Sequence, residues 1–229
     1  MPSAAHPSPG AGAGAPPSPA EPACADLVMD LILSRRSVAP KRLLVPGPSD
    51  SELQRLVDAA ATAPDHRGLA PWRLVRVLDH QREPLAQLFE ACASDRDPAP
   101  DAQQLAQARA KAFRAPSLLL AVLKTLPEEA EVPPTERAVA LGAALMVLLL
   151  AAHGMGYAGM LTSGRAVRTM RFAQAFALGP GEQAVCFVSL GTAATRPPAA
   201  ARNAEAADAA GPRLGDWAGP ARINPEPGA

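Results

Sequence analysis

Two arginines and a serine stand side by side where an amphipathic segment of this chain gives way to a turn: Arg35, Arg36 and Ser37. A guanidinium group can donate two parallel hydrogen bonds to an oxyanion, and a hydroxyl can add a third. The three side chains therefore suit a phosphate group. A basic helix end can also do no more than complement the helix dipole, so these residues alone leave both interpretations open.

A second candidate segment is the loop at 63–72, with the sequence Ala-Pro-Asp-His-Arg-Gly-Leu-Ala-Pro-Trp. Its prolines predict a loop held in one shape, with His66 in the middle. A lone histidine in such a loop is more often a structural hydrogen-bonding residue than a catalyst. No second histidine or carboxylate stands at metal-ligand spacing, so we expect no metal site.

A third candidate segment follows the strand predicted at 157–161. Thr162, Ser163 and Gly164 supply small hydroxyls and a permissive glycine, which would let a ring or a phosphate approach the backbone closely. The alternative is an ordinary strand-to-helix turn in which Ser163 caps the helix. The residues themselves favour this simpler interpretation.

The glycines at 154–159 match the dinucleotide-binding pattern G-x-G-x-x-G in letters only. That pattern works when a strand precedes it and a helix follows, so that a pyrophosphate meets a helix N-terminus. Here a helix is predicted before it and a strand after it, which favours a helix C-cap and turn. Nucleophile-elbow, P-loop and H-E-x-x-H patterns do not occur. The sequence therefore gives no motif that indicates a hydrolase or a kinase.

The elements that must position these segments mix helices and strands without regular βαβ alternation, which predicts an α+β sandwich. Asp26 is expected to cap the first helix, which would end near the basic corner, and the capping-box spacing at 49–52 opens a second that stops before Pro64. Further helices are predicted at 82–93, 101–113, 135–153 and 166–178, and strands at 72–78, 117–123, 157–161 and 184–190.

The helix predicted at 135–153 is apolar nearly all round. Its apolar run, from Ala138 to Ala152, is bounded by Arg137 and His153 and is short for a bilayer-spanning helix. We therefore expect no membrane association and a helix buried on most faces, either in the core or between subunits.

The amino-acid composition excludes some kinds of partner and cellular setting. The chain has 22 basic and 22 acidic residues and no long run of either sign, which argues against nucleic acid as a partner. Three widely spaced cysteines fit a reduced, cytoplasmic setting, and no secretory signal is recognisable. The Pro, Ala and Gly content predicts a disordered leader at 1–23, one domain at 24–196 and a tail at 197–229.

Taken in order along the chain, these segments resemble the small YdjA-like branch of the nitroreductase family. The resemblance covers about residues 27–196 and is carried by Arg-Arg-Ser-Val at 35–38, Ala-Pro-Asp-His-x5-Trp-Arg at 63–73, Arg114-Ala115-Pro116, Glu136, Ser163-Gly164 and Leu190-Gly191-Thr192. It implies a three-layer α+β sandwich, with a mixed central sheet flanked by helices, in a domain-interlocked homodimer. It also implies FMN bound non-covalently at the subunit interface and NAD(P)H as electron donor.

The resemblance also implies roles for individual residues. FMN would be bound by Arg35, Arg36, Ser37, Thr62, His66, Leu161, Thr162, Ser163 and Arg196. The nicotinamide nucleotide would be bound by Ala151, Ala152, His153, Gly154, Met155 and Gly156. Relatives commonly have Trp-Arg where this chain has Leu161-Thr162, so an aromatic ring and a guanidinium are missing at those positions.

The implied function is a ping-pong reductase that passes electrons from NAD(P)H to nitroaromatic, quinone-like or other small oxidised acceptors. Flavin N5 would carry the chemistry, and no catalytic side chain is assigned. The changed Leu161-Thr162 pair motivates an alternative, a flavin-binding or flavin-processing protein without NAD(P)H reductase activity. An interaction module without a cofactor is a third possibility.

Overall fold

The computed structural model describes residues 22–95, 97, 99–126 and 131–194. The predicted tail and nearly all of the predicted leader lie outside these residues. In the described part, the α-helices are α1 (Pro22–Ser34), α2 (Asp50–Ala60), α3 (Arg82–Ser94), α4 (Ala102–Ala110), α5 (Pro134–Gly154) and α6 (Met170–Ala175). The strands are β1 (Leu43–Leu44), β2 (Trp72–Arg76), β3 (Ser117–Leu123), β4 (Ala158–Thr162) and β5 (Gln183–Ala193).

Strand β5 is the centre of the sheet. It pairs antiparallel with β3, β4 and β1, and β3 pairs antiparallel with β2 at the edge of the sheet. A parallel bridge between Ser37 and Gly159 adds the basic corner to β4, which makes the sheet mixed. Because β5 is bonded along both edges, it holds segments that lie far apart in the sequence.

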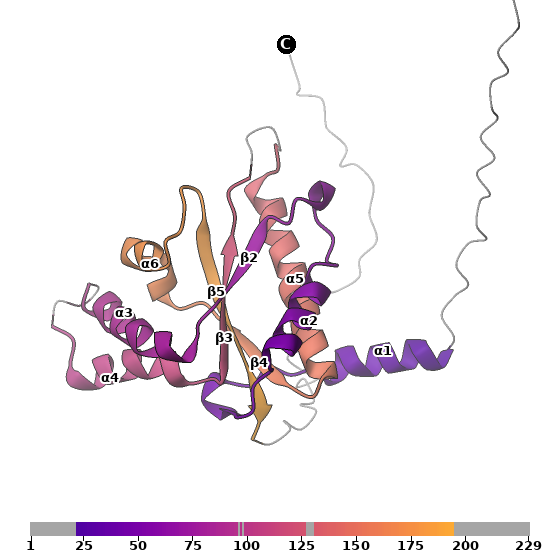
Figure 1. The fold of residues 1–229 in the computed structure, drawn as a ribbon, viewed down its shortest axis with the longest axis horizontal. Helices are drawn as coiled ribbons and strands as arrows, with labels where there is room; N and C mark the ends of the chain where they lie inside the picture. Colours follow the sequence, from indigo (N-terminus) through magenta and orange to yellow (C-terminus); the bar gives the residue numbers. More distant parts are fainter. Residues whose placement is uncertain (1–21, 96, 98, 127–130, 195–229) are drawn as a thin grey trace, which may run out of the picture. The chain divides into compact units, whose positions relative to one another are not determined.

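Helices cover both faces of this sheet, as Figure 1 shows. Helices α3, α4 and α6 lie on one face, and α2 and α5 lie on the other. Strand β3 supplies both cores, because Leu118, Leu120 and Val122 point to the α3 side while Leu119 and Ala121 point to the α5 side. The predicted three-layer α+β sandwich is therefore confirmed, and the unbroken apolar run of β3 reflects burial on both faces.

Helix α5 packs one face against α2, β3 and β4. In the described part of the chain it is the one helix long and apolar enough to cross a membrane, and only part of its apolar surface is buried within the fold. The prediction that it is buried on most faces holds only for that side. Its opposite side is apolar and open, with Val139 71% exposed and Met146 37% exposed.

Most predicted elements agree with the structure to within a few residues, and two predictions were wrong. Helix α1 begins at Pro22, so Asp26 lies inside it and is not its cap. Proline is favoured in the first turn and alanine extends a helix, which explains the earlier start. The helix predicted at 166–178 is split into the short 3-10 turn η6 (Arg165–Arg168) and α6.

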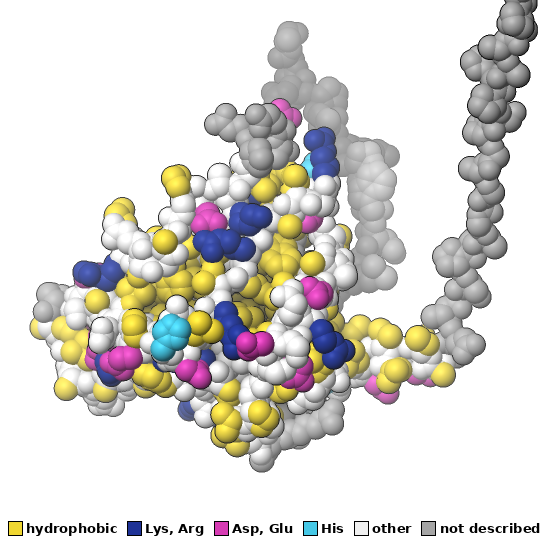
Figure 2. Space-filling model, in the orientation of Figure 1, with side chains coloured by type: hydrophobic (Ala, Val, Ile, Leu, Met, Phe, Trp, Pro, Cys, Tyr) yellow, Lys and Arg dark blue, Asp and Glu magenta, His cyan; other side chains and the backbone are white. Residues whose placement is uncertain are grey.

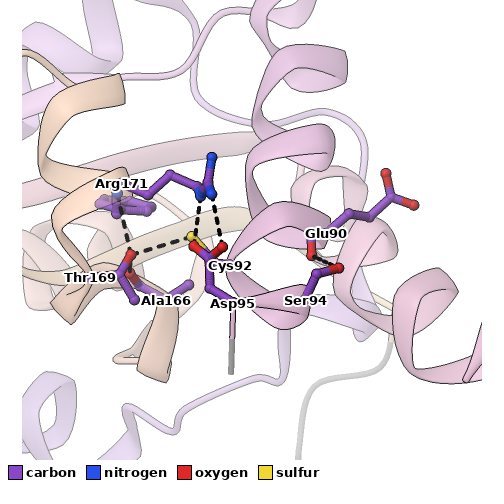
Figure 3. A network of polar contacts seen from close by, with 8 residues as sticks. Glu90, Cys92, Ser94, Asp95, Ala166, Thr169 and Arg171 are labelled. Atoms are coloured by element: carbon purple, nitrogen blue, oxygen red, sulfur yellow. Dashed lines mark hydrogen bonds and ion pairs between the residues drawn. The ribbon is translucent and has the colours of Figure 1, made fainter. Parts of the chain in front are cut away.

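The break falls at Thr169, whose extended backbone (φ −90°, ψ 149°) interrupts the helix. Its hydroxyl accepts a hydrogen bond from the N–H of Phe172 and so caps α6. Figure 3 shows how this capping residue is tied to α3: Thr169 Oγ1 lies 3.3 Å from Cys92 Sγ, and Arg171 makes two hydrogen bonds to Asp95. These contacts fix the position of η6 relative to α3.

The motif residue Arg73 has a structural partner. On β2, its guanidinium donates two hydrogen bonds of 2.7 Å to the carboxylate of Glu182, in the turn that precedes β5. The Gly179 N–H donates a further hydrogen bond of 3.0 Å to the same carboxylate. Arg73 first, and then the Gly179 N–H, lower the pKa of Glu182 to about 2.

This contact predicts a pH-dependent contribution to stability. The pKa of Glu182 is about 2 in the folded chain and ordinarily 4.5, so its contribution is complete above pH 4.5 and is lost as pH falls through about 2. We expect Glu182→Gln to lower the free energy of unfolding at pH 7. Urea unfolding of both proteins from pH 7 to pH 2 would show the difference narrowing below about pH 4.5. A difference that stays constant over this range would contradict the assignment.

Candidate functional site

The basic corner lies against the edge of the sheet. The residues after α1 run parallel to β4, with Ser37 bridged to Gly159 and the Val38 N–H donating to the Gly159 carbonyl over 3.1 Å. Gly159 allows β4 to fit tightly, because a Cβ at this position would lie 2.7 Å from the Ser189 carbonyl oxygen and 2.7 Å from Leu190 Cδ2. The first and third predicted segments are thus brought together on one stretch of paired backbone.

At one end of this stretch, Arg35 and Arg36 line a small hollow together with Leu149, His153 and Tyr157. The Arg36 guanidinium donates to the Arg35 carbonyl over 2.9 Å, which leaves this side chain turned back on its own corner. The Arg35 Nε is buried and has no hydrogen-bond partner among the described residues. A buried donor without a partner is costly, so this atom marks a place where an anion would be stabilised.

At the other end lies a cavity of about 460 Å³. The end of β4 contributes Leu161 and Thr162 to its lining, Ser163 follows directly after the strand, and Pro40 of the segment after the basic corner contributes to it as well. From Gly159 to Thr162 an extended strand advances about 10 Å, so the hollow and the cavity are near neighbours along β4. The 3-10 turn that follows has Gly164 as its N-cap, so Ser163 does not serve as the cap.

Basic side chains border the cavity from the opposite side. Lys111, in the 3-10 turn η4 (Lys111–Phe113), and Arg114 both line it. Their segment is held by Arg82 of α3, which is only 6% exposed and donates to the carbonyls of Ala112 (3.0 Å) and Pro116 (2.9 Å). Burial lowers the pKa of this arginine, whose two hydrogen bonds secure the turn.

The second predicted segment lies elsewhere in the chain. His66 begins the 3-10 turn η2 (His66–Gly68), and its Nδ1 lies 3.4 Å from Oε2 of Glu136, at the N-terminal end of α5. His153, near the basic corner, is at the other end of the same helix. Seventeen residues of α-helix span about 25 Å, so one chain does not bring His66 to the hollow beside Arg35.

The loop around His66 has an unusual backbone. Arg67 (φ 56°), Gly68 (φ 68°) and Ala70 (φ 44°) all have positive φ angles. Asp65 holds the loop together by accepting a hydrogen bond of 2.9 Å from the Ala70 N–H. Its other carboxylate oxygen is buried without a partner among the described residues. Strained backbone of this kind persists where surrounding contacts fix it, and it is frequent at functional sites.

The segment predicted to bind the nicotinamide nucleotide forms the C-terminal end of α5 and the turn after it. A helix precedes this glycine-rich stretch and β4 follows it, which confirms that it is a helix end and not a dinucleotide-binding turn. Gly154 faces Leu31 of α1, and the Ser34 hydroxyl lies 2.9 Å from His153 Nε2. The remaining predicted residue, Arg196, lies outside the described residues.

Three basic cavity residues, Lys111, Arg114 and Arg165, were not predicted as site residues. The motif Arg114-Ala115-Pro116 was a signal for the second of them, because it directly precedes a buried strand. Nothing in the sequence indicated Arg165, since its position depends on the break at Thr169.

The fold and the paired segments define the class of protein. The chain belongs to the nitroreductase family, whose model matches residues 32–192. It is 32% identical over 168 residues to the Escherichia coli K12 protein YdjA, whose name ascribes to it an NAD(P)H nitroreductase activity. The match covers 72% of this chain and 87% of YdjA.

Solved structures share the fold. A nitroreductase-like family protein from Bacillus cereus aligns with a TM-score of 0.62 at 19% identity, over 73% of this chain and 86% of that one. A protein from Desulfovibrio desulfuricans, solved in complex with FMN, aligns with a TM-score of 0.56 at 22% identity, over 74% of this chain and 87% of that one. At these identities the structural likeness concerns the fold.

The fit at Gly159 can be tested by substitution. We expect Gly159→Ala to destabilise the chain by about 1–3 kcal/mol, because the new methyl group would overlap the Ser189 carbonyl and Leu190. Gly179→Ala is the matched control, since its nearest neighbour would be at an ordinary 3.8 Å. Urea unfolding would measure both variants. Equal stabilities for the two would contradict the close approach.

Proposed function

We propose that this chain is an FMN-dependent oxidoreductase that passes electrons from NAD(P)H to small oxidised acceptors such as nitroaromatics or quinones. Membership of the nitroreductase family and the likeness to YdjA support the reaction class. The FMN complex of the relative from Desulfovibrio desulfuricans supports the cofactor. The observation that carries the proposal is the pairing of Ser37 with Gly159, which sets the arginine corner and the cavity on one edge.

The residues present fit a flavin mononucleotide. The buried Arg35 Nε lacks a partner and suits the phosphate, with Arg36 and Ser37 beside it. Thr162 and Ser163 present small side chains at the cavity, which suits close approach of the flavin ring. Lys111 lines the same cavity and would place positive charge beside that ring.

The chemistry that FMN supplies when bound is two-electron transfer from NAD(P)H to an acceptor. The protein binds and orients the cofactor through the segments at 35–37 and 161–163. Residues 151–156 adjoin the basic corner, and we keep them as the proposed contact for the nicotinamide nucleotide. We assign proton transfer to no side chain; His66 lies 3.4 Å from Glu136 and is proposed only as a contact to FMN.

We further propose a homodimer in which each site is shared. On α5, the exposed Val139 and Met146 belong to a stripe of apolar residues that also includes the half-buried Ala143, Val147 and Leu150. Helix α1 carries more exposed apolar side chains, and Figure 2 shows hydrophobic side chains along it. Among them, Leu27 is 70% and Leu33 60% exposed. Apolar surface of this extent favours an interface.

A two-fold axis across the middle of α5 would pack the helix antiparallel to its copy. The N-terminal end of one helix would then meet the C-terminal end of the other. This arrangement would place His66 of the partner subunit near Arg35 and β4. Within one chain, the segment with Thr62 and His66 lies far from the segment with Arg35. The proposed dimer explains this distance, because Thr62 and His66 would complete the site of the other chain.

A cytoplasmic location completes the proposal. Cys92 and Cys186 are buried cysteines, and burial raises the pKa of the Cys186 thiol to about 11. Such a thiol stays protonated and unreactive at neutral pH. Both side chains lie in the hydrophobic cores, which fits a reducing compartment.

The reductase reaction is tested with the purified full chain loaded with FMN. We expect anaerobic NADH or NADPH to bleach the yellow protein, and a nitroaromatic or quinone to restore the colour. A yellow protein that neither nucleotide bleaches would favour the alternative function, a flavin-binding or flavin-processing protein without reductase activity. A protein that does not bind FMN at all would overturn both functions and favour an interaction module.

The shared site is tested by mixing two variants. We expect Arg35→Ala to weaken FMN binding by roughly 1.5–3 kcal/mol through loss of a charge-assisted contact, and His66→Ala to weaken it from the other subunit. Arg55→Ala, an exposed change on α2, is the control. Subunits of the two variants are mixed, dissociated and allowed to reassociate.

If each site uses Arg35 of one chain and His66 of the other, random reassociation makes half of the dimers mixed. Each mixed dimer has one intact site, so about a quarter of the wild-type FMN sites return. Flavin fluorescence quenching would count the tight sites. Reassociated dimers without any recovered tight site would contradict a site shared in this way.

A further inference from the structure

The cavity beside Thr162 has a lining of one charge sign. Lys111, Arg114 and Arg165 line it, and no Asp or Glu does so among the residues that the structure describes. The whole chain has 22 basic and 22 acidic residues, so the excess of positive charge is local. A concave surface with charges of one sign concentrates ligands of the opposite sign.

Two of these cations are not neutralised by the protein. Elsewhere, Arg73 pairs with Glu182, Arg109 with Glu83 and Glu90, and Arg171 with Asp95. Arg114 and Arg165 have no carboxylate or hydrogen-bond partner in the described parts of the chain. Their guanidinium groups are therefore available to an anion that enters the cavity.

The rest of the lining is apolar. Phe89, Leu118 and Phe187 are buried side chains that also line the cavity. Leu161 also lines the cavity and is 36% exposed. Its side chain is aliphatic, so the cavity has no aromatic ring at position 161. The combination suits a flat apolar body with a negatively charged substituent.

The position of Arg165 is set by the core. It opens the turn η6, whose Val167 is buried. The turn is followed directly by Thr169, which is tied to Cys92 of α3 as Figure 3 shows. Arg168 lies on the same turn, is exposed, and does not line the cavity. The turn thus offers one arginine directed to the cavity and one matched arginine that is not.

We propose that Arg165, with Arg114, makes this cavity selective for aromatic acceptors that carry an anionic group such as a carboxylate. This inference rests on the proposed reductase function and specifies the acceptor class for the same site. The guanidinium groups would hold the carboxylate while the apolar lining holds the ring. The competing assignment, in which these arginines serve only the flavin, is an outcome of the test.

The test compares 4-nitrobenzoate with 4-nitrobenzamide, which differ chiefly in charge. The FMN-loaded full chain is reduced anaerobically with dithionite, so that the result does not depend on NAD(P)H, and its reoxidation by each acceptor is timed. We expect wild-type protein to prefer the carboxylate, and Arg165→Gln to reduce the ratio of the two rate constants about tenfold. Arg168→Gln should leave this ratio unchanged, and added salt should weaken the preference.

A direct binding measurement separates this inference from the proposed function. Equilibrium dialysis of 4-nitrobenzoate against the flavin-free chain should show weaker binding to Arg165→Gln than to Arg168→Gln. Equal reoxidation rates for the two acceptors in wild-type protein would overturn the proposal even where NADH bleaches the flavin. A ratio that Arg165→Gln leaves unchanged while FMN affinity falls would assign the arginine to the flavin. Failure to bind FMN would overturn the function, and loss of the dialysis difference would overturn the anion site.

Discussion

The close contact between β4 and β5 at Gly159 is the constraint on which the proposed site depends. A side chain at this position would overlap the Ser189 carbonyl and Leu190, so only a glycine lets β4 lie as it does. The same residue accepts the hydrogen bond from Val38 and forms the bridge to Ser37. One backbone position therefore fixes both the edge strand and the arginine corner that lies against it.

Helix α5 links this edge to the rest of the molecule. One side of the helix fills the core with α2 and the sheet, and the other side is apolar without a covering element among the described residues. Segments of the proposed site lie at its two ends, with Glu136 and His66 at one end and the residues near Arg35 at the other. The length of the helix keeps these segments apart within one chain, and the proposed homodimer would join them.

Local sequence patterns predicted the parts of the fold that depend on local interactions. The capping box at 49–52 and the apolar run at 117–123 are found where they were expected, because each signal is complete within a few residues. The start of α1 and the break at Thr169 were missed. Asp26 and Thr169 are both plausible capping residues, and only packing against other elements decides which of them caps a helix.

The candidate site was predictable to a similar degree. The structure brings the segments at 35–37 and 161–163 onto one edge, and both were proposed as site segments from the family resemblance, because residue types alone left the second as an ordinary turn. Lys111, Arg114 and Arg165 could not be placed, because their common position depends on Arg82, on the pairing of β3 with β5 and on the turn after β4. Long-range contacts of this kind leave no pattern in neighbouring residues.

The split between η6 and α6 also affects how readily the residues that line this cavity can change. Because Val167 and Thr169 hold the turn, its exposed positions contribute little to packing and can change without disturbing the sheet. A charge gained or lost at residue 165 would change the charge of the cavity lining while the stability of the fold stays nearly constant. Under the proposed selectivity, the turn is a place where closely related chains could diverge in acceptor preference through single substitutions.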